Sequence, residues 1–367
     1  DSSTSRGLGD VYKRQEIKGL LSAKLKAITT MKLKTFLIVG CLGGFFALNS
    51  CTAPTNEKDY SVFVNPFIGT GGHGHTFPGA VVPHGMIQPS PDTRIDGWDA
   101  CSGYYYEDST INGFSHTHVS GTGCCDYGDV LLMPTVGEQR YQTTDPQSQQ
   151  LAYSSAFSHE NETAEPGYYS VFLDTYQVKA EISATKRGAI HRYTFPESSE
   201  AGFILDLDYS LQRQTNSDMG IEVISDTEIC GHKKTTYWAF DQYINFYAKF
   251  SKPFSYTLVT DSITMDNGKR LPVCKVLLHF NTTKDEQVLV KVGISAVDIA
   301  GARKNVESEI PGWDFDKVRK NARSAWNQYL SKIDITTPDK DDKTIFYTAL
   351  YHLSLIHISE PTRRRGI

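Results

Sequence analysis

Short runs of residues that suit β-strands follow one another from residue 167 to residue 297, and no long stretch with helical periodicity interrupts them. The runs have strand length, many β-branched and aromatic residues, and partial alternation of apolar and polar positions. This pattern predicts a mainly β protein, a large antiparallel β-sandwich over residues 59–305. The runs lie at 167–195, which reads as three strands, and at 202–210, 243–251, 254–263, 272–281 and 287–297.

Helical periodicity begins only after the strands. Asp314 is a suitable N-cap, and the apolar residues after it recur every three to four positions. These residues are Phe315, Val318, Ala322, Trp326 and Tyr329. We therefore predict a linker helix within residues 306–335. A second helical run is expected from Lys343 to His352, inside a separate segment at 336–352.

The N-terminal part of the chain predicts export. Residues 31–50 combine two lysines with an apolar core that is too short for a comfortable membrane span, which is typical of a signal peptide. The ending Leu48-Asn49-Ser50-Cys51 resembles the lipoprotein box of bacteria, which would make Cys51 the lipidated first residue, with a tether over 51–58. The alternative is an ordinary secretory signal with a chance cysteine. We predict a lipoprotein held at a membrane through Cys51, at the outer membrane or cell surface or in the periplasm.

Two terminal stretches are left out of the fold argument. Residues 1–30 and 353–367 resemble translated adapter sequence rather than native protein. Met31 is then the expected true start, and the natural protein is expected to continue beyond His352.

Charge and cysteine content exclude several classes of function. The net charge of -5 gives no reason to expect a nucleic-acid partner, and no glycine-rich phosphate loop is present. The cysteines outside the leader have no metal-type spacing, and their spacing does not define disulfide pairs. They are Cys101, Cys124, Cys125, Cys230 and Cys274.

Residues 65–134 carry an unusual mixture of glycine, histidine, tyrosine and a lone tryptophan. Glycines let the backbone approach a ligand closely. Flat aromatic rings beside Asp, His and Arg suit a sugar, which offers apolar C–H faces and a rim of hydroxyl groups. We interpret this stretch as half of a carbohydrate site. The predicted substrate-binding residues are His73, His75, Trp98, Asp99, His116 and His118, and the predicted supporting residues are Arg94, Asp126 and Asp129.

Each candidate also has a simpler explanation. Trp98 could be core, although the neighbouring Asp96 and Asp99 make burial costly. His116 and His118 could be a structural pair, or a metal pair for which no third ligand is evident. Solvent exposure alone could explain the histidines of the 71–76 turn. The two later aspartates could anchor backbone N–H groups, and Arg94 could pair with an aspartate.

Several motifs in order give the chain a family resemblance. They are Asn65-Pro66-Phe67-Ile68-Gly69-Thr70, Pro83-His84-Gly85-Met86, Asp96-Gly97-Trp98, Ser102-Gly103-Tyr104, Gly113-Phe114-Ser115-His116-Thr117-His118, Ser120-Gly121-Thr122-Gly123-Cys124 and Asp126-Tyr127-Gly128-Asp129. This series resembles glycoside hydrolase family 92, the exo-acting α-mannosidases. The resemblance runs from about residue 59 to residue 352.

The resemblance implies a β-sandwich followed by a helical linker and a catalytic (α/α)6 barrel, here truncated after its first helix. It implies inversion of configuration, a calcium cofactor, mannose-containing glycans such as N-glycans as substrates, α-1,2 linkage preference, and a sandwich-domain tryptophan beside the leaving-group sugar. The catalytic acid and base and the calcium ligands are expected in the barrel, so the resemblance implies no catalytic or metal-binding residue in this chain and no activity of the fragment alone. The alternatives are a non-catalytic carbohydrate-binding surface lipoprotein, or a different hydrolase that uses the histidine-rich loop as a metal site.

Overall fold

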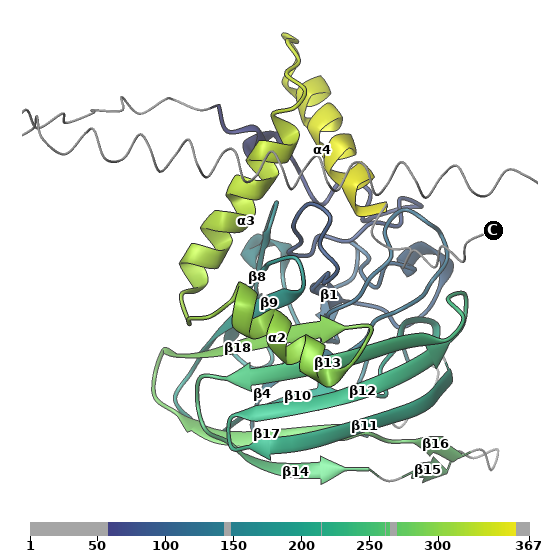
Figure 1. Cartoon of the computed structure of the whole chain (residues 1–367), viewed down its shortest axis with the longest axis vertical. Coiled ribbons are helices and arrows are strands. Elements are labelled where there is room, and N and C mark those ends of the chain that lie inside the picture. Colours follow the sequence, from purple (N-terminus) through teal and green to yellow (C-terminus); the bar gives the residue numbers. More distant parts are fainter. Residues whose placement is uncertain (1–57, 143–147, 214, 261, 265–269, 357–367) are drawn as a thin grey trace, which may run out of the picture. The chain divides into compact units, whose positions relative to one another are not determined.

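Two antiparallel sheets form the body of the protein (Figure 1). The computed structural model describes residues 58–142, 148–213, 215–260, 262–264 and 270–356. The smaller sheet has the order β1 (Ser90–Asp92), β3 (Gly113–Ser115), β4 (Leu131–Val136), β10 (Ser198–Asp206), β17 (Lys275–Thr282) and β14 (Ser255–Val259). The larger sheet has the order β11 (Thr215–Ser225), β12 (Glu228–Thr236), β13 (Gln242–Phe250), β18 (Glu286–Ser295), β9 (Gly188–Phe195), β8 (Val178–Ala184), β7 (Tyr168–Leu173) and β6 (Glu162–Glu165). The predicted β-sandwich is confirmed.

Two small sheets complete the strand structure. One pairs β2 (Thr110–Ile111) with β5 (Ser155–Ala156), and the other pairs β15 (Ser262–Thr264) with β16 (Arg270–Pro272). Within the part of the chain that the structure describes, four short 3-10 helices lie in the loops: η1 (Tyr60–Phe63), η2 (Trp98–Ala100), η3 (His159–Asn161) and η4 (Leu211–Arg213).

The core between the sheets is centred on Phe203 of β10. Its ring contacts Tyr193 and Phe195 on β9 and Phe250 on β13, at centroid separations of 5.0, 5.6 and 5.6 Å. Because β10 belongs to the smaller sheet and the other strands to the larger one, these ring contacts join the two sheets. Aromatic pairs of this kind add about 0.5–1.5 kcal/mol each beyond the burial of apolar area.

The structure differs from the sequence prediction at the hairpin β11–β12. This segment has a weak apolar alternation and two central glycines, Gly220 and Gly231, so it lacks the pattern that identified the other strands. The predicted run at 254–263 is divided between β14 and β15, which lie in different sheets.

The predicted linker helix at 306–335 is two helices in the structure. The first, α2 (Ile299–Glu309), is capped by Asp298, whose carboxylate accepts from Gly301 N at 2.6 Å. It lies against β18 and β13 (Figure 1). Close approach is possible because residue 293 is glycine: a Cβ there would lie 2.5 Å from Val306 Cγ2.

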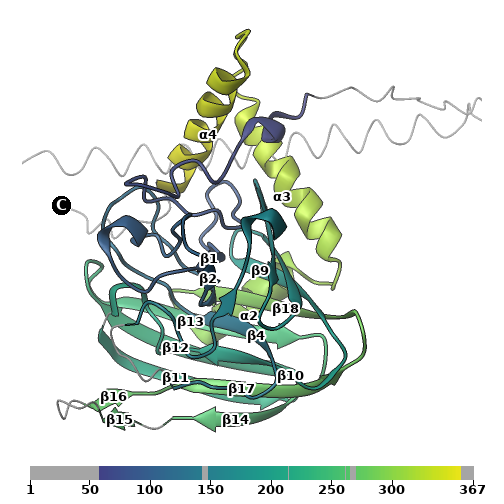
Figure 2. The same ribbon diagram turned by 180° about the vertical axis from the view of Figure 1, so that it is seen from behind.

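The second helix, α3 (Phe315–Leu330), begins as predicted at Asp314, which accepts a hydrogen bond from Lys317 N at 2.9 Å. Its first half packs with Tyr168 and Ile190 on the larger sheet and with Ile310, the residue that follows α2. Its second half packs with the N-terminal segment and with α4 (Lys340–Ile356), near the loops of residues 60–130 (Figure 2).

The last helix extends beyond its predicted bounds of Lys343 and His352. It continues to Ile356, and Ser354 and Leu355 are fully buried. Within the described ranges, no helix is long and apolar enough to cross a membrane. The predicted signal peptide at 31–50, Cys51 and residues 1–30 lie outside the described residues.

Candidate functional site

Four of the predicted substrate-binding residues come together in one place. His73, His75, Trp98 and Asp99 form a group that we call the Trp98 cluster. Trp98 opens the short helix η2 directly after Gly97, and 62% of its surface is exposed. The ring of His75 meets the Trp98 ring edge-on, with centroids 4.7 Å apart and an interplanar angle of 86°. An exposed tryptophan that is braced in this way offers a flat apolar surface to a ligand.

The glycine-rich loop forms the wall behind Trp98. Gly123 has φ +59°, and a Cβ there would lie 2.7 Å from Trp98 Cη2 and 3.0 Å from His75 Cε1. Gly121 N donates to the carbonyl of His75 at 2.6 Å, and the hydroxyl of Ser102 donates to the same carbonyl. The backbone of residue 75 is therefore fixed from two directions, which sets the position of its ring against Trp98.

The polar groups of the cluster lie beside the tryptophan ring. His73 Nδ1 and Asp99 Oδ1 are 2.5 Å apart, and both side chains reach solvent. Burial lowers the pKa of His75, against a smaller opposing effect of the Asp99 charge, so its ring is neutral at pH 7. Among the described residues, none hydrogen-bonds its buried Nε2. The cluster thus presents an apolar ring next to the carboxylate of Asp99 and the imidazole of His73, with the buried His75 supporting the Trp98 ring.

The Trp98 cluster does not fit a calcium ion. It is the group of described residues whose ligand atoms converge, with His73, His75 and Asp99 offering atoms within 4.8 Å of one another. Calcium requires six to eight oxygen ligands, whereas this group supplies two imidazole nitrogens and one carboxylate. The described residues therefore provide no suitable calcium site here.

The structure places His116 and His118 inside the protein, contrary to the predicted contact with substrate. Both side chains are 0% exposed. His116 uses Nδ1 on the carbonyl of Val130 at 2.6 Å and Nε2 on His191 Nε2 at 3.0 Å. His118 contacts the carbonyl of Gln88 at 2.7 Å and Asp92 Oδ1 at 2.8 Å. β3 ends at Ser115, and residues 116–120, which follow it, are all buried.

Acid should destabilise the fold through this histidine pair. Burial lowers the pKa of His116 to about 4 and that of His191 well below its usual value, whereas both rings gain a proton near pH 6.5 in the unfolded chain. Because the unfolded state binds more protons, the free energy of unfolding should fall between pH 6.5 and about 4, by about 3 kcal/mol for His116 alone. Urea unfolding at several pH values measures this slope.

A His116→Asn variant provides the comparison, because its amide keeps a donor for the Val130 carbonyl and does not titrate. We expect a shallower fall in stability with acid for this variant. Parallel curves for the two proteins would show that His116 does not cause the acid sensitivity.

The three predicted supporting residues are all engaged within the protein. Asp126 accepts from Tyr127 N at 2.9 Å and Ala239 N at 2.7 Å. Arg94 makes two bonds to Asp108 Oδ1, at 2.8 and 3.1 Å. The third residue, Asp129, is buried; its Oδ2 accepts from Thr117 Oγ1 at 2.7 Å and Gln242 Nε2 at 2.8 Å, and its Oδ1 forms an ion pair with Lys233 Nζ at 3.0 Å.

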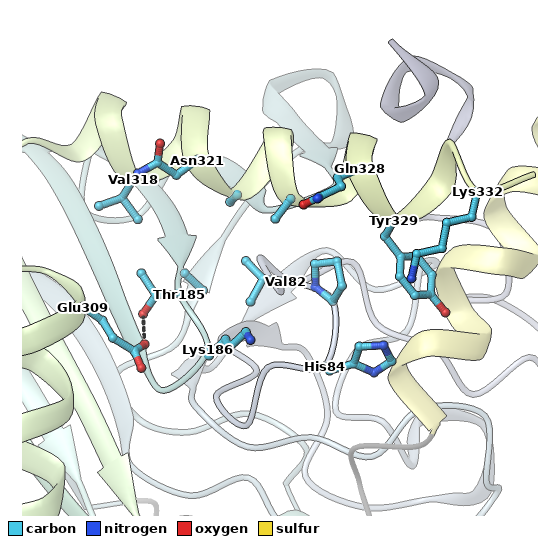
Figure 3. A pocket seen from close by; sticks show the side chains of 14 residues that line it. Val82, His84, Thr185, Lys186, Glu309, Val318, Asn321, Gln328, Tyr329 and Lys332 are labelled. Atoms are coloured by element: carbon cyan, nitrogen blue, oxygen red, sulfur yellow. Dashed lines mark hydrogen bonds between the residues drawn. The ribbon is translucent and has the colours of Figure 1, made fainter. Parts of the chain in front are cut away.

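A separate groove of about 640 Å³ lies between α3 and the turns at residues 82–84 and 184–186 (Figure 3). Thr185 and Glu309 lie at one end, and His84, Tyr329 and Lys332 at the other. Among the described residues that line it, Glu309 is the one carboxylate. Although burial opposes ionisation, hydrogen bonds from Thr185 and Arg187 lower the pKa of Glu309. Because the groove has one carboxylate, and this group already accepts hydrogen bonds from Thr185 and Arg187, the groove is a poor candidate for acid–base hydrolysis.

Comparison with known proteins identifies the family. The sequence model of the glycosyl hydrolase family 92 N-terminal domain matches residues 63–295, and that of the family's catalytic domain matches residues 301–362. The chain belongs to glycosyl hydrolase family 92. The predicted resemblance is thereby confirmed, and the family 92 N-terminal domain coincides with the two sheets described above.

Solved family 92 structures share the fold. An α-mannosidase from Bacteroides thetaiotaomicron is 36% identical, with a TM-score of 0.74 over 81% of this chain and 41% of that chain, and has also been solved with mannoimidazole. An inverting mannosidase from the same organism is 26% identical, with a TM-score of 0.68 over 80% of this chain and 39% of that chain. A protein of Arthroderma benhamiae described as an uncharacterised secreted glycosidase is 29% identical over 335 residues, 83% of this chain and 42% of its own length. The chain thus spans about two fifths of the length of these relatives.

Sequence reasoning missed one exposed feature of this family 92 chain. The loop between β12 and β13 and the start of β13 expose Tyr237, Trp238, Phe240 and Tyr243. The signal was available as the run Tyr-Trp-Ala-Phe between two charged or polar segments. This run was not predicted to be an exposed loop because the hairpin β11–β12 before it was not predicted.

Proposed function

We propose that this chain is the N-terminal part of an exported family 92 α-mannosidase and that the Trp98 cluster forms the leaving-group side of its sugar site. The observation that carries the proposal is the convergence of an exposed, braced tryptophan with His73, His75 and Asp99. The names of the relatives support the reaction: two are α-mannosidases or mannosidases, and one of them binds mannoimidazole.

The chemistry of the cluster suits binding. The Trp98 ring can cover the apolar face of a pyranose, while Asp99 and His73 hydrogen-bond to its hydroxyl groups. Hydrolysis with inversion needs a carboxylic acid and a carboxylate about 6.5–9.5 Å apart, with water between. The Trp98 cluster contains one carboxylate and so cannot supply both groups. The proposal assigns the acid and the base to the catalytic domain, and the chain alone is then expected to be inactive.

Finer features of the proposal are inversion of configuration, α-1,2 linkages, N-glycan substrates and a calcium requirement. The inverting mannosidase among the solved relatives supports the first of these. Because the Trp98 cluster does not fit calcium, we do not propose that this cluster binds the ion. We also retain, as proposals, a family 92 barrel that begins at residue 336 and non-native sequence at 1–30.

Removing the Trp98 ring tests the proposed role. In a protein that joins this chain to a complete catalytic domain, Trp98→Ala should lower kcat/KM on mannobiose at least tenfold, because the stacking surface for the leaving-group sugar is lost; this corresponds to about 1.4 kcal/mol or more. Gly123→Ala should lower it too, since a Cβ would displace the ring.

The matched control is Tyr256→Ala. This half-exposed aromatic side chain lies on β14, an edge strand of the smaller sheet, at the opposite edge from β1. This variant should behave like wild type. Near-native kinetics of Trp98→Ala would remove Trp98 from the site, and a complete protein with no activity on any mannoside would refute the function itself.

A second candidate is a non-catalytic glycan-binding lipoprotein. The single carboxylate of the Trp98 cluster favours it for the chain as it stands. Calorimetry of the full chain with mannobiose separates the two: heat of binding that is lost in Trp98→Ala, without hydrolysis even when a catalytic domain is joined, favours the second candidate.

Export and anchoring belong to the same proposal. The signal-like segment at 31–50 and Cys51 support it, as does the secreted description of the Arthroderma benhamiae relative. Labelling with a radioactive fatty acid should be lost in Cys51→Ser if Cys51 carries the lipid; unchanged labelling would contradict this.

A further inference from the structure

Four aromatic side chains are exposed within seven residues of the β12–β13 hairpin. Their exposed fractions are 45% for Tyr237, 54% for Trp238, 79% for Phe240 and 47% for Tyr243. We call this segment, residues 237–243, the aromatic hairpin. A large apolar side chain left in water forgoes about 1.5–3 kcal/mol of burial energy. Contiguous exposed apolar groups usually mark an interaction surface.

The aromatic hairpin is fixed to the body of the protein. Ala239 N donates to Asp126 Oδ2 at 2.7 Å, and Gln242 Nε2 donates to Asp129 Oδ2 at 2.8 Å. Beside this second contact, the buried Lys233 of β12 pairs with Asp129 Oδ1 at 3.0 Å. Hydrogen bonds to carboxylates are stronger than neutral ones. The rings are therefore carried by an anchored loop, which is the arrangement that a binding surface requires.

The same anchor leads to the Trp98 cluster. Asp126, which holds the tip of the hairpin, is three residues after Gly123, which lies against the rings of Trp98 and His75. Three residues of chain span at most about 11 Å. The backbone behind the Trp98 ring and the residue that anchors the tip of the aromatic hairpin are thus at most about 11 Å apart, a distance that an oligosaccharide can span.

We propose that the aromatic hairpin is a second carbohydrate-binding platform, which holds sugar units of a glycan beyond the one that Trp98 contacts. This inference rests on the proposed function, because it extends the same sugar site. Apart from Ala239, the apolar residues of the segment are all aromatic. Rings of this type stack on the C–H faces of sugars, and the Tyr237 hydroxyl can hydrogen-bond to sugar hydroxyls. Lys234 Nζ lies over the Tyr243 ring, 4.9 Å from its centroid, so Trp238 and Phe240 are the principal stacking surfaces. The hairpin therefore gives the site a preference for longer mannose-containing glycans over disaccharides.

Glycan length provides the test. Calorimetry of the full chain with mannobiose and with a branched high-mannose glycan compares wild type with a Trp238→Ala/Phe240→Ala variant. We expect the variant to bind the long glycan at least tenfold more weakly and mannobiose within twofold of wild type. Trp98→Ala should weaken both ligands, and Tyr256→Ala neither.

Each other outcome is decisive. Equal affinity of wild type and the double variant for the long glycan overturns the platform, as does a wild-type chain that binds no long glycan. Neither result touches the proposed function, which depends on hydrolysis of mannobiose by the protein with a complete catalytic domain. If the double variant melts at a lower temperature, the single variant Phe240→Ala is used instead, because that side chain is too exposed to support the fold. Unchanged affinity of this single variant for the long glycan overturns the platform, and weakened affinity supports it.

Discussion

Replacing Lys275 with methionine should lower the free energy of unfolding by about 3–5 kcal/mol, because it removes the cation from a buried charge network. Lys275 Nζ pairs with Asp206 and, at 2.9 Å, with Asp208 Oδ2. Tyr153 donates its hydroxyl to Asp206, and Cys274 N donates to Asp208. Without the lysine, two carboxylates would share a site with little access to water. Urea unfolding at pH 7.5 measures the loss.

The pH dependence of this variant provides an internal check. Burial, together with the charge of Asp206, already raises the pKa of Asp208 to about 6 in the native protein. Loss of Lys275 should raise the pKa of Asp208 further, so the folded variant binds more protons than the unfolded chain. Its deficit relative to wild type should therefore shrink as the pH falls from 7.5 to 5.

Lys252→Met is the matched control, because Lys252 pairs with Glu286 at a partly exposed site on the same domain. Exposed pairs contribute about 0–1 kcal/mol. A loss of under 1 kcal/mol for Lys275→Met, or equal losses for the two variants, would contradict the assigned role of the network.

Trp326→Ala should cost about 3–5 kcal/mol, the range for removing a fully buried aromatic side chain. The ring is 0% exposed and lies 4.5 Å from the Tyr351 ring of α4, and Nε1 donates to the carbonyl of Val81 at 2.6 Å. The substitution both creates a cavity and leaves that carbonyl without its donor. Thermal unfolding gives the total loss, and hydrogen exchange should show faster opening of α3 and α4 than of the sheets.

Trp326→Phe separates the two contributions, because it retains most of the packing but loses the hydrogen bond. We expect it to cost about 1–2 kcal/mol. Trp313→Ala, at a partly exposed tryptophan before α3, should cost less than Trp326→Ala. Uniform acceleration of exchange across the sheets and helices would show that Trp326 supports the whole domain rather than the α3–α4 contact.

Local sequence patterns predicted the fold best where one face of an element is buried. The strands β7, β8 and β9 and the capped helix after Asp314 follow from alternation and capping alone. The hairpin β11–β12 did not, because an edge strand and its neighbour with many polar residues lack a clear buried face. The cap of α2 was missed for a related reason: its helix is short and has only two buried side chains, Ala302 and Val306.

For the site, residue chemistry predicted which residue types to examine but not which of them lie in the interior. Trp98 and Asp99 lie about 24 residues from the 73–75 turn along the chain, and the fold brings the two segments together. His116 and His118 stand in an equally suggestive motif but are buried. That difference arises where the chain leaves β3 and enters the core beside His191. The contact is set by tertiary packing between segments about 75 residues apart, which no local pattern encodes.

The packing of α3 and α4 on residues from the start of the described chain also affects how the protein is made. Tyr60 and Phe77 are covered by Trp326, Tyr347 and Tyr351, so their partners are synthesised much later than they are. About 290 residues separate Tyr60 from Tyr351, and at common rates of translation their synthesis takes roughly 15–60 s. During that time the sandwich can close while the early aromatic segment stays uncovered. The growing chain is therefore expected to keep this aromatic segment exposed until α3 and α4 have been synthesised.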